Sequence, residues 1–295
     1  MKAYTLLAAI SLASSSLIAQ TDSNFKKVIT AFSWMPDGRS LILNIIKVDK
    51  AEKLPPVRGK YFFDIKTNGL KRLPIDGGGA VSDPSGKSIA FIKQINNKSA
   101  IYLYNISTGI EKPLVEDTLS KFALTWASDG NSIAYNIAEG PRENPKTEIV
   151  VYNLLTKEKK QITNSANDKS YSPSWSPFSD QILYYLEKGD SRDQIYLTDK
   201  QGSFHRNLTN DTTTLNYYPS WIDANRILYT QNPDKQMIFH LNENRREKIE
   251  GIKSSEARYN SKANKIAYVE DETRLILYDM KSKAKQTILD LEKSN

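Results

Sequence analysis

The chain of 295 residues contains no cysteine and carries a formal net charge of +7 at pH 7. It can therefore form neither a disulfide framework nor a thiolate metal site, and it lacks the residue for a bacterial lipid anchor. Its lysines and arginines are spread along the sequence without interleaved aromatic residues, which argues against a nucleic-acid partner.

The N-terminal segment has the composition of a secretory signal peptide. Lys2 precedes the apolar stretch Leu6–Ala13, and Asp22 is the first acidic residue. This stretch is too short to span a bilayer. We predict a signal peptide over residues 1–19, cleaved after Ala19, so that the mature chain begins at Gln20 and has no transmembrane segment. This places the protein in the periplasm or outside the cell.

From about residue 25 onward one arrangement recurs six times. It consists of an aromatic residue, a turn rich in Pro, Asp and Gly, and a short apolar strand, as in "SWMPDGRSLIL" from Ser33 and "TWASDGNSIAY" from Thr125. The first apolar residue after each turn marks the repeat, at Leu41, Ile89, Ile133, Ile182, Ile227 and Ile266. Repeats of about 40 to 50 residues are typical of propellers and other repeat arrays.

Each repeat continues with a second apolar strand that ends in a polar residue, and then with a third. Counted from the strand that carries the aromatic residue, these are the third strands of the repeats, "YFFD", "IYLYN", "IVVYN", "IYLTD", "QMIFH" and "LILYD". With the short strand before the turn, every repeat supplies four strands, which is the content of one propeller blade. We predict an all-β fold, a six-bladed β-propeller of four-stranded antiparallel blades. A single domain over residues 20–295 would hold six repeats, at approximately 25–74, 75–116, 117–164, 165–210, 211–251 and 252–291.

All four tryptophans occupy one position of the repeat, which we call the wedge position. It holds Trp34, Trp126, Trp175 and Trp221, while Ser82 and Tyr259 take it in the second and sixth repeats. A large aromatic residue that recurs once per blade on an inner strand packs most simply between neighbouring blades. We therefore predict the four tryptophans to be inter-blade core residues.

The sequence offers no constellation for catalysis. It lacks the G-x-S-x-G pentad that marks a hydrolase nucleophile, and its only histidines, His205 and His240, fall in different repeats. We interpret both as local hydrogen-bonding residues. We predict no catalytic residue, no metal site and no cofactor.

Three other features have simple structural interpretations. The run Gly77–Gly79 lacks the Lys-Ser/Thr of a phosphate loop, so we interpret it as a flexible connection between blades. Glu270–Glu272 forms an acidic triplet that we expect to be a solvated surface. Many basic residues fall between the third and fourth strands, where lysines on an exposed outer edge discourage aggregation.

The motifs quoted above, together with "SDPSGKSIAF" and "IYLYNISTG", resemble the TolB-like propeller repeat. That repeat reads W-S-P-D-G-K, then I-A-F, then I-Y, then an Asp before a turn and L-T. The resemblance covers the whole mature chain, and the turns of the fifth and sixth repeats depart from it by lacking Gly. It implies an exported six-bladed propeller that binds a partner across its channel mouth.

Two functions follow from this resemblance. The first is a non-catalytic protein-binding or scaffolding module that acts as a monomer on another envelope or secreted protein. The alternative is a propeller that recognises a carbohydrate, a peptide or another small ligand, like those that accompany hydrolases. The absence of a nucleophile motif, a histidine cluster and a ring of metal ligands favours the first.

We expect the binding site at the end of the propeller that carries the longer connections. The connections between the second and third strands are expected at residues 44–60, 136–147 and 186–194. Longer loops on a rigid scaffold are where binding residues usually lie. The candidate partner-binding residues are Phe122, Tyr171, Tyr217, Tyr218, Arg142 and Arg192. Aromatic and arginine side chains are enriched in interface hot spots.

Overall fold

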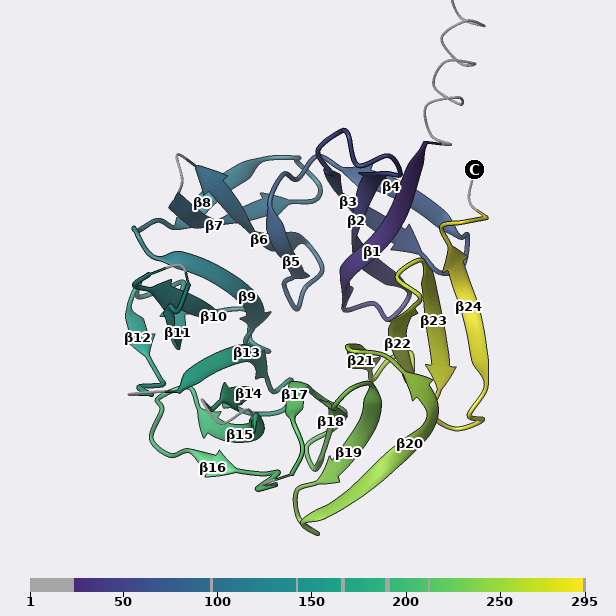
Figure 1. Cartoon of the computed structure of the whole chain (residues 1–295). Helices are drawn as coiled ribbons and strands as arrows, with labels where there is room; N and C mark the ends of the chain where they lie inside the picture. The colour runs from purple at the N-terminus through teal and green to yellow at the C-terminus, as the bar shows by residue number, and fades with distance from the viewer. Residues whose placement is uncertain are drawn as a thin grey trace, which may run out of the picture.

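The computed structural model describes residues 24–95, 98–141, 143–165, 168–188, 192–211 and 213–293. The predicted signal peptide, residues 1–19, lies outside these ranges. The described part consists of six four-stranded antiparallel sheets arranged around a central axis (Figure 1). The prediction of an all-β, six-bladed propeller is confirmed. The described residues include no helix long and apolar enough to cross a membrane.

Each blade is made of four strands that are consecutive in the sequence. The first three blades are β1 (Phe25–Trp34), β2 (Ser40–Asp49), β3 (Val57–Asp64), β4 (Gly69–Leu73); β5 (Gly78–Ser82), β6 (Ser88–Ile95), β7 (Lys98–Asn105), β8 (Glu111–Val115); and β9 (Ser120–Trp126), β10 (Ser132–Glu139), β11 (Lys146–Asn153), β12 (Lys159–Gln161). The last three are β13 (Lys169–Trp175), β14 (Gln181–Glu187), β15 (Gln194–Asp199), β16 (Arg206–Asn207); β17 (Asn216–Trp221), β18 (Arg226–Gln231), β19 (Lys235–His240), β20 (Arg245–Lys253); and β21 (Ala257–Asn260), β22 (Lys265–Glu270), β23 (Arg274–Asp279), β24 (Lys285–Asp290). The strand β20 extends two residues past the repeat boundary expected at 251.

The turns after the wedge position are held by their own aspartates. The Asp37 carboxylate accepts hydrogen bonds from the backbone N–H groups of Arg39 (2.8 Å) and Ser40 (3.0 Å). Gly38 adopts φ +69°, a left-handed conformation that glycine enters at little cost. Side-chain capping of this kind is the reason that Asp recurs in these turns.

The predicted long connections are shorter than expected, because the strands extend into them. The pairing of β2 with β3 continues to Lys47 opposite Val57, so much of residues 44–60 is strand. Strands β10 and β11 likewise pair to Glu139 opposite Lys146. Alternating apolar residues continue into these segments, and they form longer hairpins rather than irregular loops.

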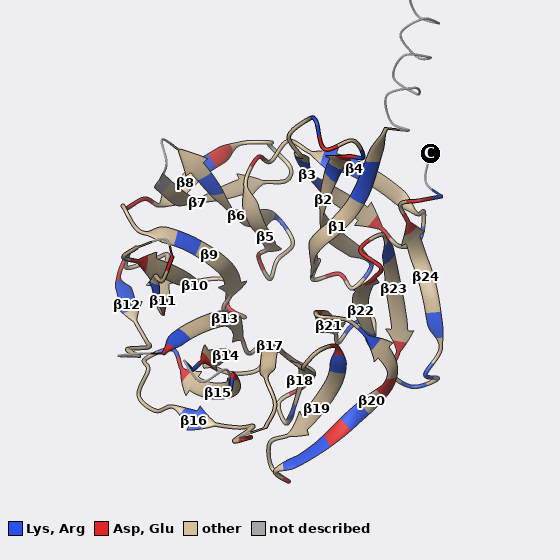
Figure 2. Ribbon diagram, in the orientation of Figure 1, with Lys and Arg blue, Asp and Glu red and all other residues tan. Residues whose placement is uncertain are grey.

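The apolar core is divided into six clusters, and each cluster joins two neighbouring blades. One example contains Leu183 and Leu197 of the fourth blade with Trp221, Tyr229 and Phe239 of the fifth. The other five clusters join the remaining pairs of neighbouring blades. Basic residues are frequent on the outer strands, and Figure 2 shows Lys and Arg on β12, β16, β20 and β24.

Within the part of the chain that the structure describes, the ring closes by contacts between blades and not by exchange of a strand, since no sheet there contains strands from both the first and last blades. The N–H of Ile29 donates to the carbonyl of Glu272 (2.6 Å), and Lys26 forms an ion pair with the Glu272 carboxylate (3.1 Å). The acidic triplet is solvated as expected, since the side chains of Asp271 and Glu272 are 71% and 70% exposed, and Glu272 also takes part in closing the ring. Arg274 pairs with both Glu270 (2.8 Å) and Asp271.

The tryptophans at the wedge position connect each blade to the preceding one. The indole Nε1–H of Trp34 donates to the carbonyl of Arg258 (2.9 Å), Trp126 to Val81 (3.3 Å) and Trp221 to Ser174 (3.0 Å). Each acceptor is the residue just before the wedge position of the preceding blade. Trp175 is buried in the corresponding cluster, but its Nε1 has no hydrogen-bond partner.

We predict that truncation of these side chains destabilises the fold. Trp126→Ala or Trp175→Ala should lower the free energy of unfolding by about 3–5 kcal/mol, since each removes a large inter-blade side chain. Trp221→Phe should cost about 1 kcal/mol more than Trp175→Phe, because only Trp221 donates an indole hydrogen bond. Chemical denaturation measures both, with the exposed Phe178→Ala as the control. Unchanged melting of both alanine variants would show that the indoles do not stabilise the interfaces.

Candidate functional site

The largest candidate site is the cavity at the centre of the ring. It has a volume of about 610 Å³, and residues of all six innermost strands line it. Its walls include the four tryptophans, Tyr259 and Ser82 of the wedge position, and the turn residues Pro36, Pro84, Ser128 and Pro177. A ligand site of this size, apolar with a few polar groups, is typical of small-molecule and peptide pockets. The cavity reaches the turns after the wedge position, whereas the sequence places the candidate binding residues at the opposite end of the propeller, and that placement stays a prediction.

A bulge interrupts the innermost strands at one level of the cavity. Three residues before the wedge position, Ala123, Ser172 and Tyr218 adopt φ between 50° and 52°, and Gly79 takes φ +23°. The register of pairing with the second strand shifts at the same points. A left-handed conformation costs a non-glycine residue about 1–2 kcal/mol. Bulges that re-aim side chains are frequent next to functional sites.

A buried asparagine holds one of these bulges in place. Asn136 is fully buried, and its Oδ1 accepts from the N–H of Ser172 (2.9 Å). Its Nδ2 donates to the carbonyl of Ser170 (2.6 Å) and to that of Glu148 (3.2 Å). Because Asn136 belongs to the third blade and Ser172 to the fourth, this amide connects the bulge of one blade to its neighbour.

The bulges lie beside a chain of contacting rings that we call the aromatic row, formed by Phe122, Tyr171, Tyr185, Tyr217 and Tyr218. The ring centroids are 6.0 Å apart between Phe122 and Tyr171 and 5.3 Å apart between Tyr171 and Tyr185. Tyr185 also lies 6.5 Å from Tyr217 and 5.8 Å from Tyr218. The structure thus brings together the four aromatic residues selected from the sequence, and their role in binding stays a prediction.

The sequence analysis missed Tyr185, which joins the two halves of the row. Tyr185 pairs with Tyr171 across β13 and β14, and its neighbour Tyr184 points to the buried interface between the third and fourth blades. The alternation of a strand was the available signal, since it places consecutive tyrosines on opposite faces. Arg192 is exposed in the β14–β15 connection, and Arg142 lies outside the described residues.

Three tyrosines of the row, Tyr185, Tyr217 and Tyr218, are buried enough to disfavour their ionised form. Burial raises the pKa of Tyr185, Tyr217 and Tyr218 above the ordinary value of 10. The Tyr217 hydroxyl donates to the carbonyl of Pro233 (2.9 Å). The row is therefore half-buried, uncharged and polar only at its hydroxyl groups, which suits the surface of a protein partner.

The charged residues of the central cavity are few. Arg258 pairs with Glu256 (2.7 Å) and donates to the carbonyl of Pro219 (3.2 Å). Lys60 is buried, and its Nζ donates to Asn44 Oδ1 (2.8 Å) and to the carbonyl of Gly77. Burial lowers the pKa of Lys60, and the nearby Asp76 offsets part of this effect.

Gly77, the first residue of the glycine run Gly77–Gly79, is in a close-packed contact, which corrects the interpretation of this residue as part of a flexible connection. Gly77 has φ +155°, and a Cβ at this residue would lie 2.1 Å from the carbonyl oxygen of Ile92. Its own carbonyl accepts the hydrogen bond from Lys60. Gly78 already belongs to β5, and Gly79 forms the bulge. The absence of a side chain is what the structure requires at Gly77.

The two histidines lie away from the cavity. His205 Nδ1 is 2.9 Å from the Tyr184 hydroxyl, and burial lowers the pKa of His205. His240 Nε2 is 3.2 Å from Glu247 Oε2 and 3.0 Å from an Arg245 nitrogen. Both make local contacts of the kind expected from the sequence. Across the described ranges, no three His, Cys, Asp or Glu residues are grouped so as to hold a metal ion.

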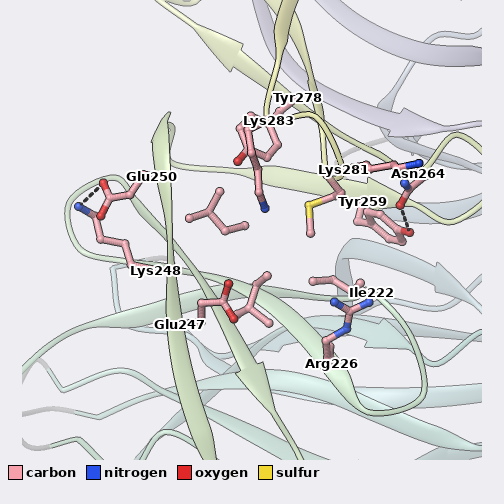
Figure 3. A pocket seen from close by; sticks show the side chains of 13 residues that line it. Ile222, Arg226, Glu247, Lys248, Glu250, Tyr259, Asn264, Tyr278, Lys281 and Lys283 are labelled. Carbon is pink, nitrogen blue, oxygen red and sulfur yellow. Dashed lines mark hydrogen bonds and ion pairs between the residues drawn. The ribbon is translucent and has the colours of Figure 1, made fainter.

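A second hollow lies between the fifth and sixth blades (Figure 3). Its volume is about 540 Å³, and its apolar lining includes Ile222, Met280 and Tyr278. Among the charged residues around it, Lys248 pairs with Glu250 (2.8 Å) and Arg226 pairs with Asp223 (2.7 Å). Four basic and two acidic side chains line this hollow, Arg226, Lys248, Lys281 and Lys283 with Glu247 and Glu250.

Comparisons with known proteins identify the fold. No family model matches the chain, and no curated protein sequence matches it. Among solved structures, the chain is similar to an oligogalacturonate lyase in complex with manganese (TM-score 0.64, 15% identity, covering 92% of this chain and 79% of the lyase). It is similar to TolB from Acinetobacter baumannii (TM-score 0.62, 15% identity, covering 89% and 78%). It is also similar to the propeller domain of the Trilobed protease from Pyrococcus furiosus (TM-score 0.60, 11% identity, covering 90% and 96%).

These similarities establish a propeller fold that TolB shares with enzymes. The TolB resemblance drawn from the repeats therefore agrees with the fold of a TolB structure. Identities of 11% to 15% carry no function across, because the same fold hosts different activities. The function has to be argued from the cavity and the aromatic row of this chain.

We predict that the bulge beside the aromatic row stores strain. Ala123→Gly should raise the free energy of unfolding by up to about 1 kcal/mol, since the relief of the left-handed alanine exceeds the added chain entropy. Ala127→Gly is the matched control, four residues along, buried and without a positive φ. It should lose about 1 kcal/mol. Equal losses for both variants in denaturant titrations would show that the bulge is unstrained.

Proposed function

We propose that the protein is an exported, non-catalytic binding propeller that takes a polypeptide segment of a partner protein into its central cavity. The observation that carries this proposal is the cavity itself, about 610 Å³ in volume and walled by the indoles and prolines of the wedge position and its turns. The partner is another envelope or secreted protein, and the propeller acts as a monomer. The resemblance of its repeats to TolB supports the same reading.

The side chains around the cavity support binding without catalysis. Glu256, the acidic residue in its lining, is engaged by Arg258, and the two histidines make their bonds elsewhere. The Ser33 hydroxyl donates to the carbonyl of Ala80 (2.7 Å) and has no base in the described contacts. A nucleophile needs an adjacent general base to be activated.

A polypeptide suits the cavity better than a sugar. A sugar ring stacks on the open face of an aromatic side chain, whereas Trp175 and Trp221 are only 5% and 6% exposed. Their faces are covered by the inter-blade clusters, and the indole N–H of Trp221 is already used. Of the alternative, a carbohydrate- or peptide-recognising propeller related to hydrolases, the cavity therefore favours recognition of a peptide over recognition of a carbohydrate.

The aromatic row supplies a second contact for the same partner. The bulge residues Ala123 and Pro173 line the cavity. Ala123 directly follows Phe122 of the aromatic row, and Pro173 is two residues after Tyr171. A segment that enters the cavity from this side passes the rings. Aromatic side chains that lose little conformational entropy on binding commonly carry interface energy.

We predict that the double variant Tyr171→Ser, Tyr217→Ser weakens capture of the native partner more than tenfold, above about 1.4 kcal/mol, with little change in thermal melting. The immobilised mature chain is incubated with envelope extract, and the captured partner is identified by mass spectrometry and then titrated. Phe178→Ser, an exposed aromatic in a turn at the other end, is the control and should bind normally. A collapsed melt would show that the row only supports the fold, and unchanged capture would exclude it from the interface.

We also predict that the exported protein begins near Gln20. Lys2, the short apolar stretch and the segment up to Ala19 are the motivation. Intact mass of the protein recovered from the envelope or the medium measures the N-terminus. A chain that still starts at Met1 would contradict export by a cleaved signal peptide.

A further inference from the structure

The cavity extends outward at one interface, between the first and second blades. At this interface the wedge position is held by Ser82, which lines the cavity and has a much smaller side chain than the indole at four of the other five wedge positions. The lining of the cavity accordingly reaches Asn44 on β2 and Lys60 on β3, behind the innermost strand of the first blade. We call this part the side arm of the cavity.

Lys60 in the side arm is a buried cation without a counter-ion. Its exposed fraction is 2%, and the two acceptors of its Nζ, Asn44 Oδ1 and the Gly77 carbonyl, are neutral. Over the described residues, no carboxylate lies within ion-pair distance of it. The charges that act on it are the exposed Asp76 and Arg58, which affect its pKa in opposite directions. An ammonium group removed from water normally requires a paired charge.

Lys121 shows how this chain accommodates a buried lysine that serves only the fold. Its Nζ is also buried, but it donates to the Asp117 carboxylate as well as to the carbonyls of Ser99 (3.0 Å) and Leu119 (2.8 Å). All three N–H groups of Lys121 are therefore used, and its charge is neutralised. Lys60 has one N–H fewer engaged and no anion, and it lines the central cavity while Lys121 does not.

We propose that Lys60 binds a carboxylate of the polypeptide segment that occupies the central cavity. This inference rests on the proposed function and names the chemistry that the segment must carry. The ammonium group supplies its remaining N–H and its charge to one carboxylate oxygen. Asn44 accepts from Lys60 through Oδ1, which leaves its NH₂ group to donate to the other oxygen. A charge-assisted hydrogen bond of this kind is about twice as strong as a neutral one.

The remainder of the cavity specifies what lies next to the carboxylate. Trp34 and Trp126 are partly buried at the cavity wall, and Pro36 and Pro84 are in the two turns that flank Ser82. These groups favour an apolar or aromatic side chain beside the anion. A C-terminal carboxylate and an acidic side chain share this chemistry, and free-acid and amidated peptides distinguish them.

The test uses two matched libraries of random pentapeptides, one with free C-terminal carboxylates and one with C-terminal amides, presented to the immobilised mature chain. Enriched peptides are identified by mass spectrometry and titrated by calorimetry. The expected result is an enrichment of peptides that carry a carboxylate, either at the free C-terminus or, in the amide library, as Asp or Glu. Their affinity should fall at least tenfold in Lys60→Met.

Two variants separate the side arm from the fold. Ser82→Trp should abolish carboxylate-dependent binding without lowering the melting temperature, because the indole fills the side arm and restores the missing wedge. The control is Lys93→Met. Lys93 belongs to the second blade, like Ser82, pairs with Glu111 and does not line the cavity, so this variant should bind like wild type. If Lys60→Met is unfolded, the outcome for Ser82→Trp decides.

Three results would overturn the inference. In the first, enriched peptides bind equally well with and without a carboxylate, or bind equally well to Lys60→Met or to Ser82→Trp. Any of these outcomes would refute the role of Lys60 but would agree with the proposed function of a peptide-binding propeller. Absence of any enriched peptide would refute the proposed function and this inference together. Binding of hexagalacturonate in place of peptides, measured in the same calorimeter, would do the same and assign the cavity to an acidic sugar.

Discussion

The interface between neighbouring blades is the interaction on which this molecule depends. A four-stranded blade has two faces, and neither can be covered within the blade itself. Each blade therefore buries its faces against the blades on both sides, which is why the apolar core forms six clusters and not one. The ring is complete only when the last interface forms, between the sixth blade and the first. That interface is closed by a cluster containing Leu43 and Leu277, by a backbone hydrogen bond and by the indole of Trp34.

A closure made only of packing and hydrogen bonds has a consequence for stability. In a ring closed by an exchanged strand, a sheet would have to be broken to separate the first and last blades. Here the sheets remain intact, and only inter-blade contacts such as the Ile29–Glu272 hydrogen bond have to separate. Each of the six interfaces has an apolar cluster of its own, so the free energy of folding is distributed around the ring as in other repeat proteins, where neighbouring units supply most of the stability.

The fold could be predicted from the repeat, because the residues that form the contacts between blades recur at the same positions of every repeat. The indole, the turn aspartate and the apolar strands recur at fixed spacing, and each has one physical task in every blade. The site was less predictable, because it arises where blades differ and where side chains from separate repeats meet. Tyr185 joins the aromatic row through the alternation of β14, and Lys60 reaches the cavity from a third strand. No spacing within one repeat indicates either contact. The close approach of Gly77 to Ile92 is likewise set by the neighbouring strand, so three consecutive glycines in the sequence suggested flexibility instead.

The departures from the repeat point to the places where the ring opens. Two blades lack tryptophan at the wedge position, the second with Ser82 and the sixth with Tyr259. The cavity enters the interface beside Ser82, and the separate hollow of Figure 3 lies at the interface beside Tyr259, whose hydroxyl bonds Asn264 within its own blade and not the preceding one. At three other interfaces an indole N–H reaches the preceding blade. A wedge residue that is small, or that bonds within its own blade, leaves space between two rigid sheets, and the sheets cannot collapse into it because their other faces are fixed by the rest of the ring. A residue other than tryptophan at the wedge position therefore weakens the contact between two blades and leaves a preformed hollow beside it. In this propeller, one position of the repeat determines both the stability of an interface and the space available for a ligand.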